Sequence, residues 1–195
     1  MLSPFCDYIR FEYDVTEEPL FLVPEIDSLR IYSKSKHDIL RAVPPALFNI
    51  MMTGSESPGS LLRKNFNQFT QKNSEMETKE GLGELSNDQI IEGIESCIEA
   101  SQVELSTFLQ ESLLRSANYG QMFLSREQQA VIANEIPKAA KLLRILNALR
   151  QPTIGLYLTL DQYQLLTPEV VISRLTLRRQ YQLGIKVFIR FEFSC

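Results

Sequence analysis

Two patterns of apolar residues follow one another along the chain, and the change between them falls near residue 44. From Phe5 to Val43 the apolar residues alternate with polar ones or form short groups rich in β-branched and aromatic side chains. Groups of this kind, separated by polar connections, predict short strands. There are four of them: DYIRFEY, LFLVPE, SLRIYS and DILRAV. The two middle groups predict one hairpin whose turn contains Asp27 and Ser28.

After Pro44 and Pro45 the apolar residues recur every three to four positions, which is the period of a helix. We expect helices over residues 46–52, 60–79, from Ser86 onward, 105–119, 126–137, 138–150, 167–178 and from Gln180 onward. Gly120 is expected to end one of them, and Pro137 to break or kink another. Amphipathic helices that follow one another without a strand between them predict stacked helix pairs. The predicted fold class is therefore mostly α.

The spacing of apolar residues also predicts which side of each helix faces the core. The expected core residues are Leu62, Phe66, Phe69 and Met76, then Ile90, Ile91, Ile94, Cys97 and Ile98, then Leu105, Phe108, Leu109, Leu113 and Ala117, and finally Ala139, Leu142, Leu143, Leu146 and Leu149. The basic residues on or beside the opposite side of the last helix are Lys138, Lys141, Arg144 and Arg150. We interpret them as a solvated face and not as a nucleic-acid surface, because no aromatic residue is interleaved with them.

Composition narrows the class of protein. The chain has 195 residues, of which 44% are hydrophobic, and a net charge of −4. That charge gives no global field that would attract nucleic acid or an anionic membrane. The sequence has neither a membrane-spanning run of roughly 20 apolar residues nor a signal-peptide pattern, so we expect a cytoplasmic protein. Residues 1–100 carry 17 acidic and 9 basic side chains and residues 101–195 carry 7 and 11, a division that complementary surfaces or partners would explain.

Candidate catalytic chemistry is sparse. His37 is the only histidine and lies in the polar stretch YSKSKHDIL, where we expect a solvated turn residue. A metal site built on histidines would need two or three of them. Cys6, Cys97 and Cys195 are far apart, which favours reduced thiols over a disulfide framework or a thiolate metal cage.

Phosphate-binding and paired-carboxylate motifs are also missing from the sequence. Gly81 and Gly83 are not followed by Lys-Ser or Lys-Thr, and we interpret them as a hinge. The acidic pairs are Glu17 with Glu18 and Glu75 with Glu77, and both lie in polar segments where no apolar environment would separate their pKa values. We therefore expect no catalytic, metal-binding or cofactor-binding residue and no cofactor.

Three stretches resemble a known family. LLRSANYGQMFL followed by KLLRILNALRQPTIGLYLTLDQYQLLTPEVVISRLTLRRQYQLGIKV is similar to the start of the helical region of the vacuolar protein sorting-associated protein 16 family. LFLVPEIDSLRIYSKSKHDILRAVP resembles the end of that family's N-terminal β-propeller, and PGSLLRKNFNQFTQKNSEM resembles its first long helix. The resemblance implies that residues 1–44 are the last strands of a β-propeller, residues 45–85 a long helix and linker, and residues 86–195 the start of an α-solenoid.

The resemblance also implies a function. Members of this family are non-enzymatic scaffold subunits of the class C core of the HOPS and CORVET tethering complexes, which act in traffic from endosomes to the vacuole or lysosome and in membrane fusion. The implied partners are the other class C subunits. The implied location is cytoplasmic and peripheral on late endosomes and vacuoles or lysosomes, with membrane association only through the complex.

No partner-binding residue is assigned by the resemblance. Arg144, Asn147 and Arg150 stand out as polar residues in the stretch KLLRILNALR. We expect them to cap carbonyl groups or to pair with acids between stacked helices rather than to touch a partner.

The family protein is several times longer than this chain, so the chain resembles an internal fragment. The start MLSPFCDY and the tail VFIRFEFSC are expected to be ends of a truncated gene product. The distal helices that hold the Sec1/Munc18-like subunit in the family are not expected here. The alternative function is a free-standing helical protein-interaction adaptor, or a non-functional truncated product.

Overall fold

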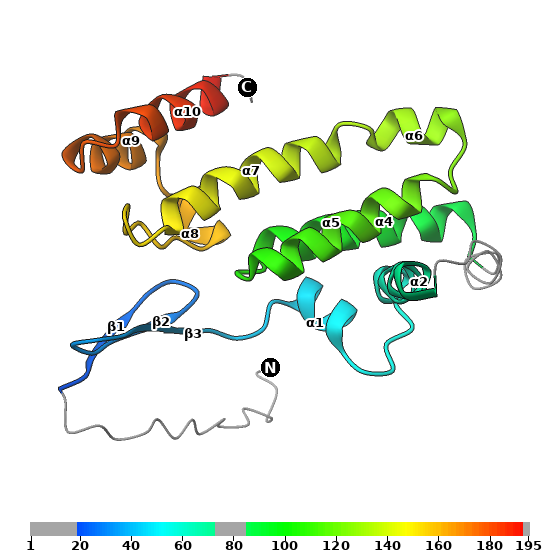
Figure 1. Cartoon of the computed structure of the whole chain (residues 1–195), viewed down its shortest axis with the longest axis horizontal. Helices are drawn as coiled ribbons and strands as arrows, with labels where there is room; N and C mark the ends of the chain where they lie inside the picture. Colours follow the sequence, from blue (N-terminus) through cyan, green and yellow to red (C-terminus); the bar gives the residue numbers. More distant parts are fainter. Residues whose placement is uncertain (1–18, 73–84, 193–195) are drawn as a thin grey trace, which may run out of the picture. The chain divides into compact units, whose positions relative to one another are not determined.

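The computed structural model describes residues 19–72 and 85–192, which form a mostly helical chain with a small sheet near its N-terminal end, as predicted (Figure 1). The chain divides into two compact units, residues 1–42 and residues 43–195. Some expectations lie outside the described residues: the strand over residues 7–13, Cys6, Cys195, the two acidic pairs, Gly81 with Gly83, Met76 and the end of the helix expected over 60–79.

The first unit contains a three-stranded antiparallel sheet in the order β1-β2-β3. Its strands are β1 (Phe21–Pro24), β2 (Leu29–Tyr32) and β3 (His37–Leu40), which confirms three of the four predicted strands. The backbone N–H of Glu25 donates to the carbonyl of Ser28 at 2.8 Å. The hairpin turn therefore contains Asp27 and Ser28, as the sequence pattern predicts.

Arg30 is the buried charged residue of this sheet. Only 5% of its surface is exposed. Its Nε lies 2.5 Å from Oε1 of Glu25, and its Nη1 lies 3.2 Å from Nε2 of His37. A buried guanidinium is stable only where other groups replace its water. The contact with Glu25 therefore ties the hairpin turn to the middle strand.

The second unit begins with helices that share one hydrophobic cluster: α1 (Pro45–Met51), α2 (Pro58–Lys72), α4 (Asn87–Val103) and α5 (Thr107–Gln121). Helix α4 packs along α5 and also against α2 and α1. Its buried side chains include Ile90, Ile94 and Cys97, which confirms the core face predicted for it. Ser86 caps α4 as predicted, since its side chain accepts the N–H of Gln89 and its own N–H donates to the Gln89 side chain.

Two glycines let these helices approach closely. A Cβ at Gly93 of α4 would lie 2.9 Å from the carbonyl oxygen of Pro58, at the start of α2. A Cβ at Gly120 would lie 2.8 Å from Cγ1 of Ile94 and 2.9 Å from Cδ2 of Leu62. The prediction that Gly120 ends its helix is wrong, because α5 continues to Gln121. Gly120 serves close packing instead of a turn.

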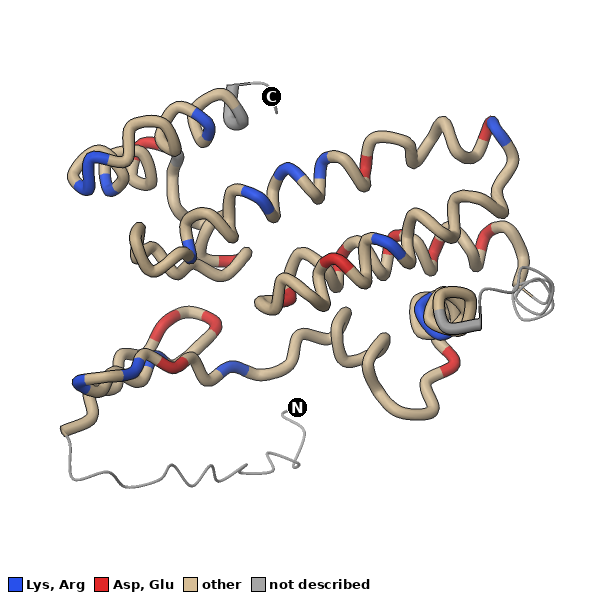
Figure 2. The backbone as a smooth tube through the Cα atoms, in the orientation of Figure 1, with Lys and Arg blue, Asp and Glu red and all other residues tan. Residues whose placement is uncertain are grey.

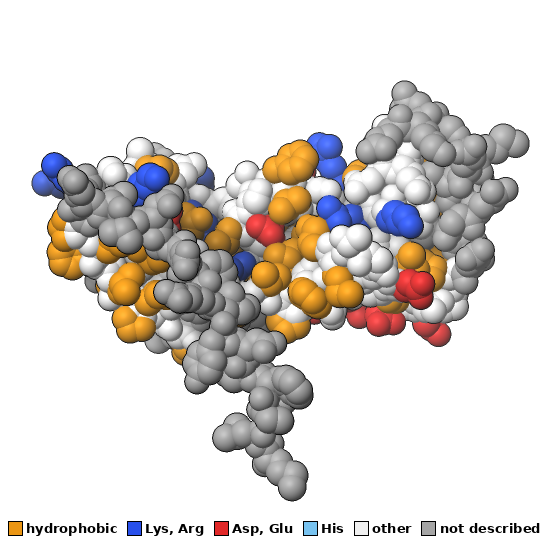
Figure 3. Space-filling view, turned by 90° about the horizontal axis from the view of Figure 1, so that it is seen from below, with side chains coloured by type: hydrophobic (Ala, Val, Ile, Leu, Met, Phe, Trp, Pro, Cys, Tyr) orange, Lys and Arg blue, Asp and Glu red, His pale blue; other side chains and the backbone are white. Residues whose placement is uncertain are grey.

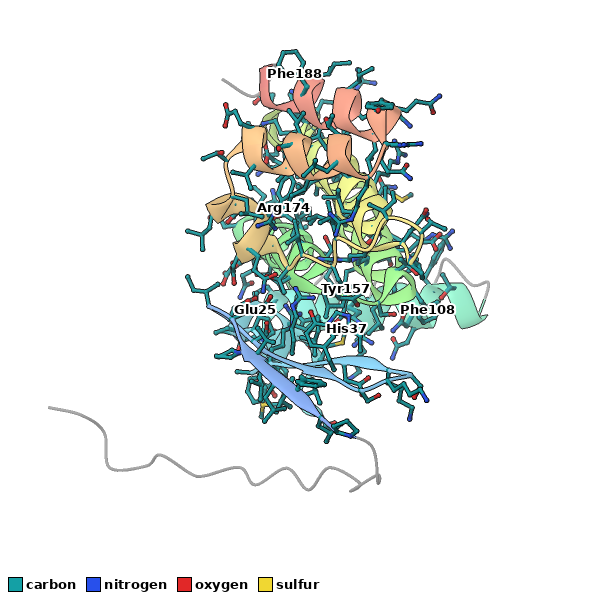
Figure 4. All side chains as sticks on the ribbon, turned by 90° about the vertical axis from the view of Figure 1, so that its left-hand side faces the viewer. Glu25, His37, Phe108, Tyr157, Arg174 and Phe188 are labelled. Carbon is teal, nitrogen blue, oxygen red and sulfur yellow. The ribbon has the colours of Figure 1, made fainter. Side chains whose placement is uncertain are left out.

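The core face predicted for α5 is wrong at Phe108. The Phe108 side chain, labelled in Figure 4, is 75% exposed, whereas Leu113 and Ala117 are fully buried. Phe108 precedes Leu113 by five residues, which is about 140° around a helix of 3.6 residues per turn. The two side chains therefore cannot face the same core, and Gln110 is the residue of this turn that is buried.

Helices α6 (Arg126–Ile132) and α7 (Glu135–Arg150) are separated at Ala133 and Asn134. The prediction of one helix from Arg126 to Pro137 is wrong, because the break precedes the proline. Pro137 lies in the first turn of α7, where backbone N–H groups have no acceptor within the helix and a proline is tolerated. The core residues predicted for α7 are confirmed: Ala139, Leu142, Leu143, Leu146 and Leu149 are buried.

A second hydrophobic cluster joins α7 to α8 (Leu160–Leu165), α9 (Pro168–Leu177) and α10 (Tyr181–Glu192). The sequence pattern does not predict the six-residue α8, whereas α9 starts after Thr167 and α10 after Gln180 as expected. Helix α7 belongs to both clusters, since Ala139 packs in the first and Leu146 in the second. It contacts α4 and α5 on one side and α10 on the other.

Candidate protein-interaction surface

A network of polar side chains joins α5 to α7. The Gln110 Nε2 group donates to the backbone carbonyl of Glu104 at 2.7 Å, and Nδ2 of Asn147 donates to Oε1 of Gln110 at 2.7 Å. Nη1 of Arg150 donates to Oδ1 of Asn147 at 3.3 Å. Gln110 and Arg150 are 3% and 8% exposed, so both lie inside the unit. Buried polar groups of this kind fix one relative position of two helices, because any other position leaves a donor or acceptor unpaired.

Arg150 also holds the chain segment that follows α7. Its Nε donates to the carbonyl of Leu158 at 2.8 Å, and its guanidinium carbon lies 6.0 Å from the ring centre of Tyr157. The prediction that Arg150 lies on or beside the solvated side of α7 is wrong. Its guanidinium is buried because the Leu158 carbonyl and Oδ1 of Asn147 accept its N–H groups in place of water.

A groove of about 460 Å³ runs between α5 and α7, and we name it the α5–α7 groove. Its lining residues are Thr107, Gln110, Glu111, Leu114, Arg115, Asn118, Ala140, Leu143, Arg144 and Asn147. Glu111 pairs with Arg115 along α5, with Nη2 of Arg115 2.6 Å from Oε1 of Glu111. Arg144 is exposed at the edge of the groove. The lining is mixed in character, which suits a surface for protein contact more than a site for one small ligand.

The structure separates the three residues that the sequence singles out. Asn147 and Arg150 belong to the polar network, and Arg144 stays outside it on the groove edge. Gln110 is the member that the sequence analysis missed. The sequence feature that could have identified Gln110 is its position three residues before Leu113, on the buried stripe of α5. An amide there is unfavourable unless it is hydrogen-bonded, so a partner is expected.

Helix α10 offers a second candidate surface because it is apolar on opposite sides. Leu183 and Val187 are buried in the second cluster. The opposite side carries Tyr181, Ile185, Phe188 and Ile189, each between 48% and 58% exposed. Figure 4 shows Phe188 at the outer edge of this helix. The second cluster covers only one of the two apolar sides of α10, so this α10 outer face is suited to packing against a further helix.

The candidate nucleophiles of the described residues lie apart from these surfaces. Burial raises the pKa of the Cys97 thiol to about 12, with Arg63 opposing the effect. The thiol donates to the carbonyl of Gly59 at 3.6 Å, so Cys97 is a core residue, as predicted. His37 is the first residue of β3 and not a turn residue; its ring stacks on Tyr32 with 4.5 Å between ring centres.

We expect the pKa of His37 to lie below 6.5 in the folded chain. Partial burial disfavours the imidazolium most, the Arg30 guanidinium disfavours it next, and Glu25 and Asp38 oppose both effects. The folded chain then binds fewer protons than the unfolded chain, so the sheet loses stability as the pH falls through the window that lies below 6.5. Since His37 is the only histidine, one NMR titration curve reports it. A midpoint at or above 6.5 would contradict this expectation.

Among residues 19–72 and 85–192, no three histidine, cysteine or acidic side chains gather closely enough to hold a metal ion. The same residues include no helix long and apolar enough to cross a membrane. What they do form is a mostly helical chain with a groove of mixed lining and a last helix that exposes apolar side chains. This places the chain, by its structure, among mostly helical proteins that carry a small antiparallel sheet.

The chain belongs to the Vps16 family. The family model described as "Vps16, N-terminal region" matches residues 1–132. Protein VACUOLELESS1 of Arabidopsis thaliana is 36% identical over 187 residues, which are 96% of this chain and 21% of the relative. The vacuolar protein sorting-associated protein 16 homolog of Drosophila melanogaster is 33% identical over 181 residues, or 93% of this chain and 20% of the relative.

A yeast relative shows the same extent of similarity. Vacuolar protein sorting-associated protein 16 of Saccharomyces cerevisiae is 29% identical over 174 residues, which are 89% of this chain and 20% of the relative. The chain therefore spans about a fifth of the length of the curated relatives that it matches. The names of the fly and yeast relatives assign those proteins to vacuolar protein sorting.

Proposed function

We propose that this chain acts as part of a non-enzymatic scaffold subunit of a vesicle-tethering complex of the HOPS and CORVET type. In this role it joins the other class C subunits and holds endosomal, vacuolar or lysosomal membranes near one another before they fuse. Its location is peripheral on late endosomes and vacuoles or lysosomes, through the complex.

The observation that carries the proposal is the family match over residues 1–132. It is supported by relatives at 29% to 36% identity along nearly all of this chain, two of them named for vacuolar protein sorting. Scaffolding needs surfaces and defined spacing, not a reactive centre. The α5–α7 groove and the α10 outer face are such surfaces.

We also propose a place for each unit in a larger architecture. The three strands of the first unit have the length and antiparallel order of strands in a propeller blade. The helices of the second unit follow one another in packed layers, as the opening of an α-solenoid would. On this proposal the α10 outer face is where the next helical layer packs, because its four exposed apolar residues would then leave water.

Immunoprecipitation of the endogenous protein tests the tethering role. An antibody raised against this chain is used on detergent-free lysate, and the recovered proteins are identified by mass spectrometry. We expect the other class C subunits in amounts comparable to the bait. An immunoprecipitate that contains the bait without any class C subunit would overturn the proposal and favour a free-standing helical adaptor.

A further inference from the structure

A second groove, between the C-terminal end of α1 and the outer face of α2, has no role in the proposal above. It encloses about 290 Å³, and we name it the α1–α2 groove. Its lining residues are Ile50, Met51, Met52 and Thr53 from α1 and its end, and Ser60, Arg63, Lys64, Asn67 and Gln68 from α2. On α2 these residues recur at intervals of three and four, so they form one continuous stripe along the helix.

The charge of this groove has one sign. Arg63 and Lys64 line it, and its lining contains no acidic residue. Within the part of the chain that the structure describes, neither cation has an ion-pair partner. The neighbouring helix α4 is acidic, with Asp88, Glu92, Glu95 and Glu99 and no basic residue, and it packs against α2. Figure 2 shows basic residues on α2 and acidic residues along α4. The two cations thus stay unpaired although acidic side chains lie on the next helix.

Arg63 has a buried hydrogen-bond donor that lacks an acceptor within residues 19–72 and 85–192. Its Nε atom is buried and has no hydrogen-bond acceptor among the described residues. A buried donor without an acceptor is unfavourable, more so when it carries charge. Because the buried Nε is not open to a ligand, a carboxylate seated in the groove would accept from the Nη groups of Arg63 and would also neutralise Lys64, whose side chain is exposed.

The opposite wall of the groove is apolar and adaptable. Met52 is 52% exposed, and Met51 is half-buried beside it. Phe48 lies one helical turn before Met52 and is 51% exposed, so an apolar stripe continues from the groove along α1. Figure 3 shows apolar and basic side chains next to one another on the face seen from below. Methionine side chains adjust their shape to different apolar partners, which suits recognition of a peptide.

We propose that the α1–α2 groove binds a short acidic and apolar peptide segment of a partner protein, with its carboxylates on Arg63 and Lys64 and an apolar side chain on Met52. A peptide fits these observations better than an anionic bilayer. Helix α4, which packs against α2, carries four acidic residues and no basic residue, and these acids repel an extended anionic surface but leave the local basic groove accessible to one segment. The inference does not depend on the tethering role, since peptide binding can be measured on this chain alone.

The test uses a fluorescein-labelled synthetic peptide that alternates Asp and Glu with Leu and Phe, and fluorescence anisotropy with the 195-residue chain. We expect saturable binding that weakens as salt is added. Lys64→Glu and Arg63→Gln should each raise the Kd about tenfold, because each removes a charge-assisted contact. The matched control is Lys141→Glu, which makes the same charge change as Lys64→Glu at an exposed position of α7 and should leave the Kd within about twofold.

Several outcomes would overturn the proposal. The first is that the chain shows no saturable binding of the peptide. The second is that Lys141→Glu lowers the affinity as much as Lys64→Glu does. The third is that a peptide whose Asp and Glu are replaced by Asn and Gln binds with unchanged affinity. Capture of the chain by phosphatidylserine vesicles in a Lys64-dependent way, without peptide binding, would assign the groove to a membrane instead. Because Lys64 is exposed, Lys64→Glu keeps the fold, which a circular dichroism melting curve verifies.

Discussion

Replacing Leu146 with alanine is expected to lower the free energy of unfolding of the helical unit by about 2–5 kcal/mol. Leu146 is fully buried, in the C-terminal half of α7 and inside the second hydrophobic cluster. Removing its branched end takes away apolar contacts and leaves a cavity that surrounding helices fill only in part. Chemical denaturation of the 195-residue chain, followed by circular dichroism at 222 nm, measures the change.

The matched control for this substitution is Leu177→Ala. Leu177 is the last residue of α9 and is 83% exposed, so the same chemical change removes almost no buried surface. Its effect should stay within about 0.5 kcal/mol. If the two variants lost the same free energy of unfolding, burial in the second cluster would not be what stabilises the unit.

Replacing Gly93 with alanine is expected to destabilise the chain by about 1–3 kcal/mol, although alanine is the better helix former. The new methyl group would lie 2.9 Å from the Pro58 carbonyl oxygen and 3.0 Å from its carbonyl carbon. These are backbone atoms that cannot rotate away, so α2 would have to move off α4. The midpoint of thermal unfolding should fall by about 2–4 °C for each kcal/mol.

Gly184→Ala separates this steric effect from helix propensity. Gly184 lies inside α10, and a Cβ built there meets no atom within 4 Å. The same substitution should therefore raise stability by about 0.5–1 kcal/mol. The two variants have effects of opposite sign, and a stabilising Gly93→Ala would contradict the close approach of α2 to α4.

The helices of this fold could be predicted from sequence where an apolar stripe and a cap agree. Ser86 and Thr167 mark the starts of α4 and α9 correctly, and the buried stripe of α7 follows its 3.6-residue period from Ala139 to Leu149. Helix α8 could not be predicted in this way, because six residues are too few to show a helical period. Its start at Thr159 follows the apolar run IGLYL, which has no helical spacing.

The candidate surfaces were harder to predict than the helices. Arg150 has the sequence context of a solvated base, and its burial depends on the Leu158 carbonyl and Asn147, which only the folded chain brings within reach. Pro137 has the sequence signature of a helix break, but its effect depends on where α7 starts. A proline inside a helix breaks it, but the same proline is tolerated when the helix starts one or two residues before it.

Helix α7 has a mechanical consequence because both hydrophobic clusters include it. Force applied at α10 passes through packed side chains to α7, and from there to α4 and α5, without crossing a flexible connection. We therefore expect the described helices of the second unit to resist bending at α7 more than helices joined only by loops would. Groups attached to α4 and to α10 would then vary less in their separation than the length of the connecting chain alone allows.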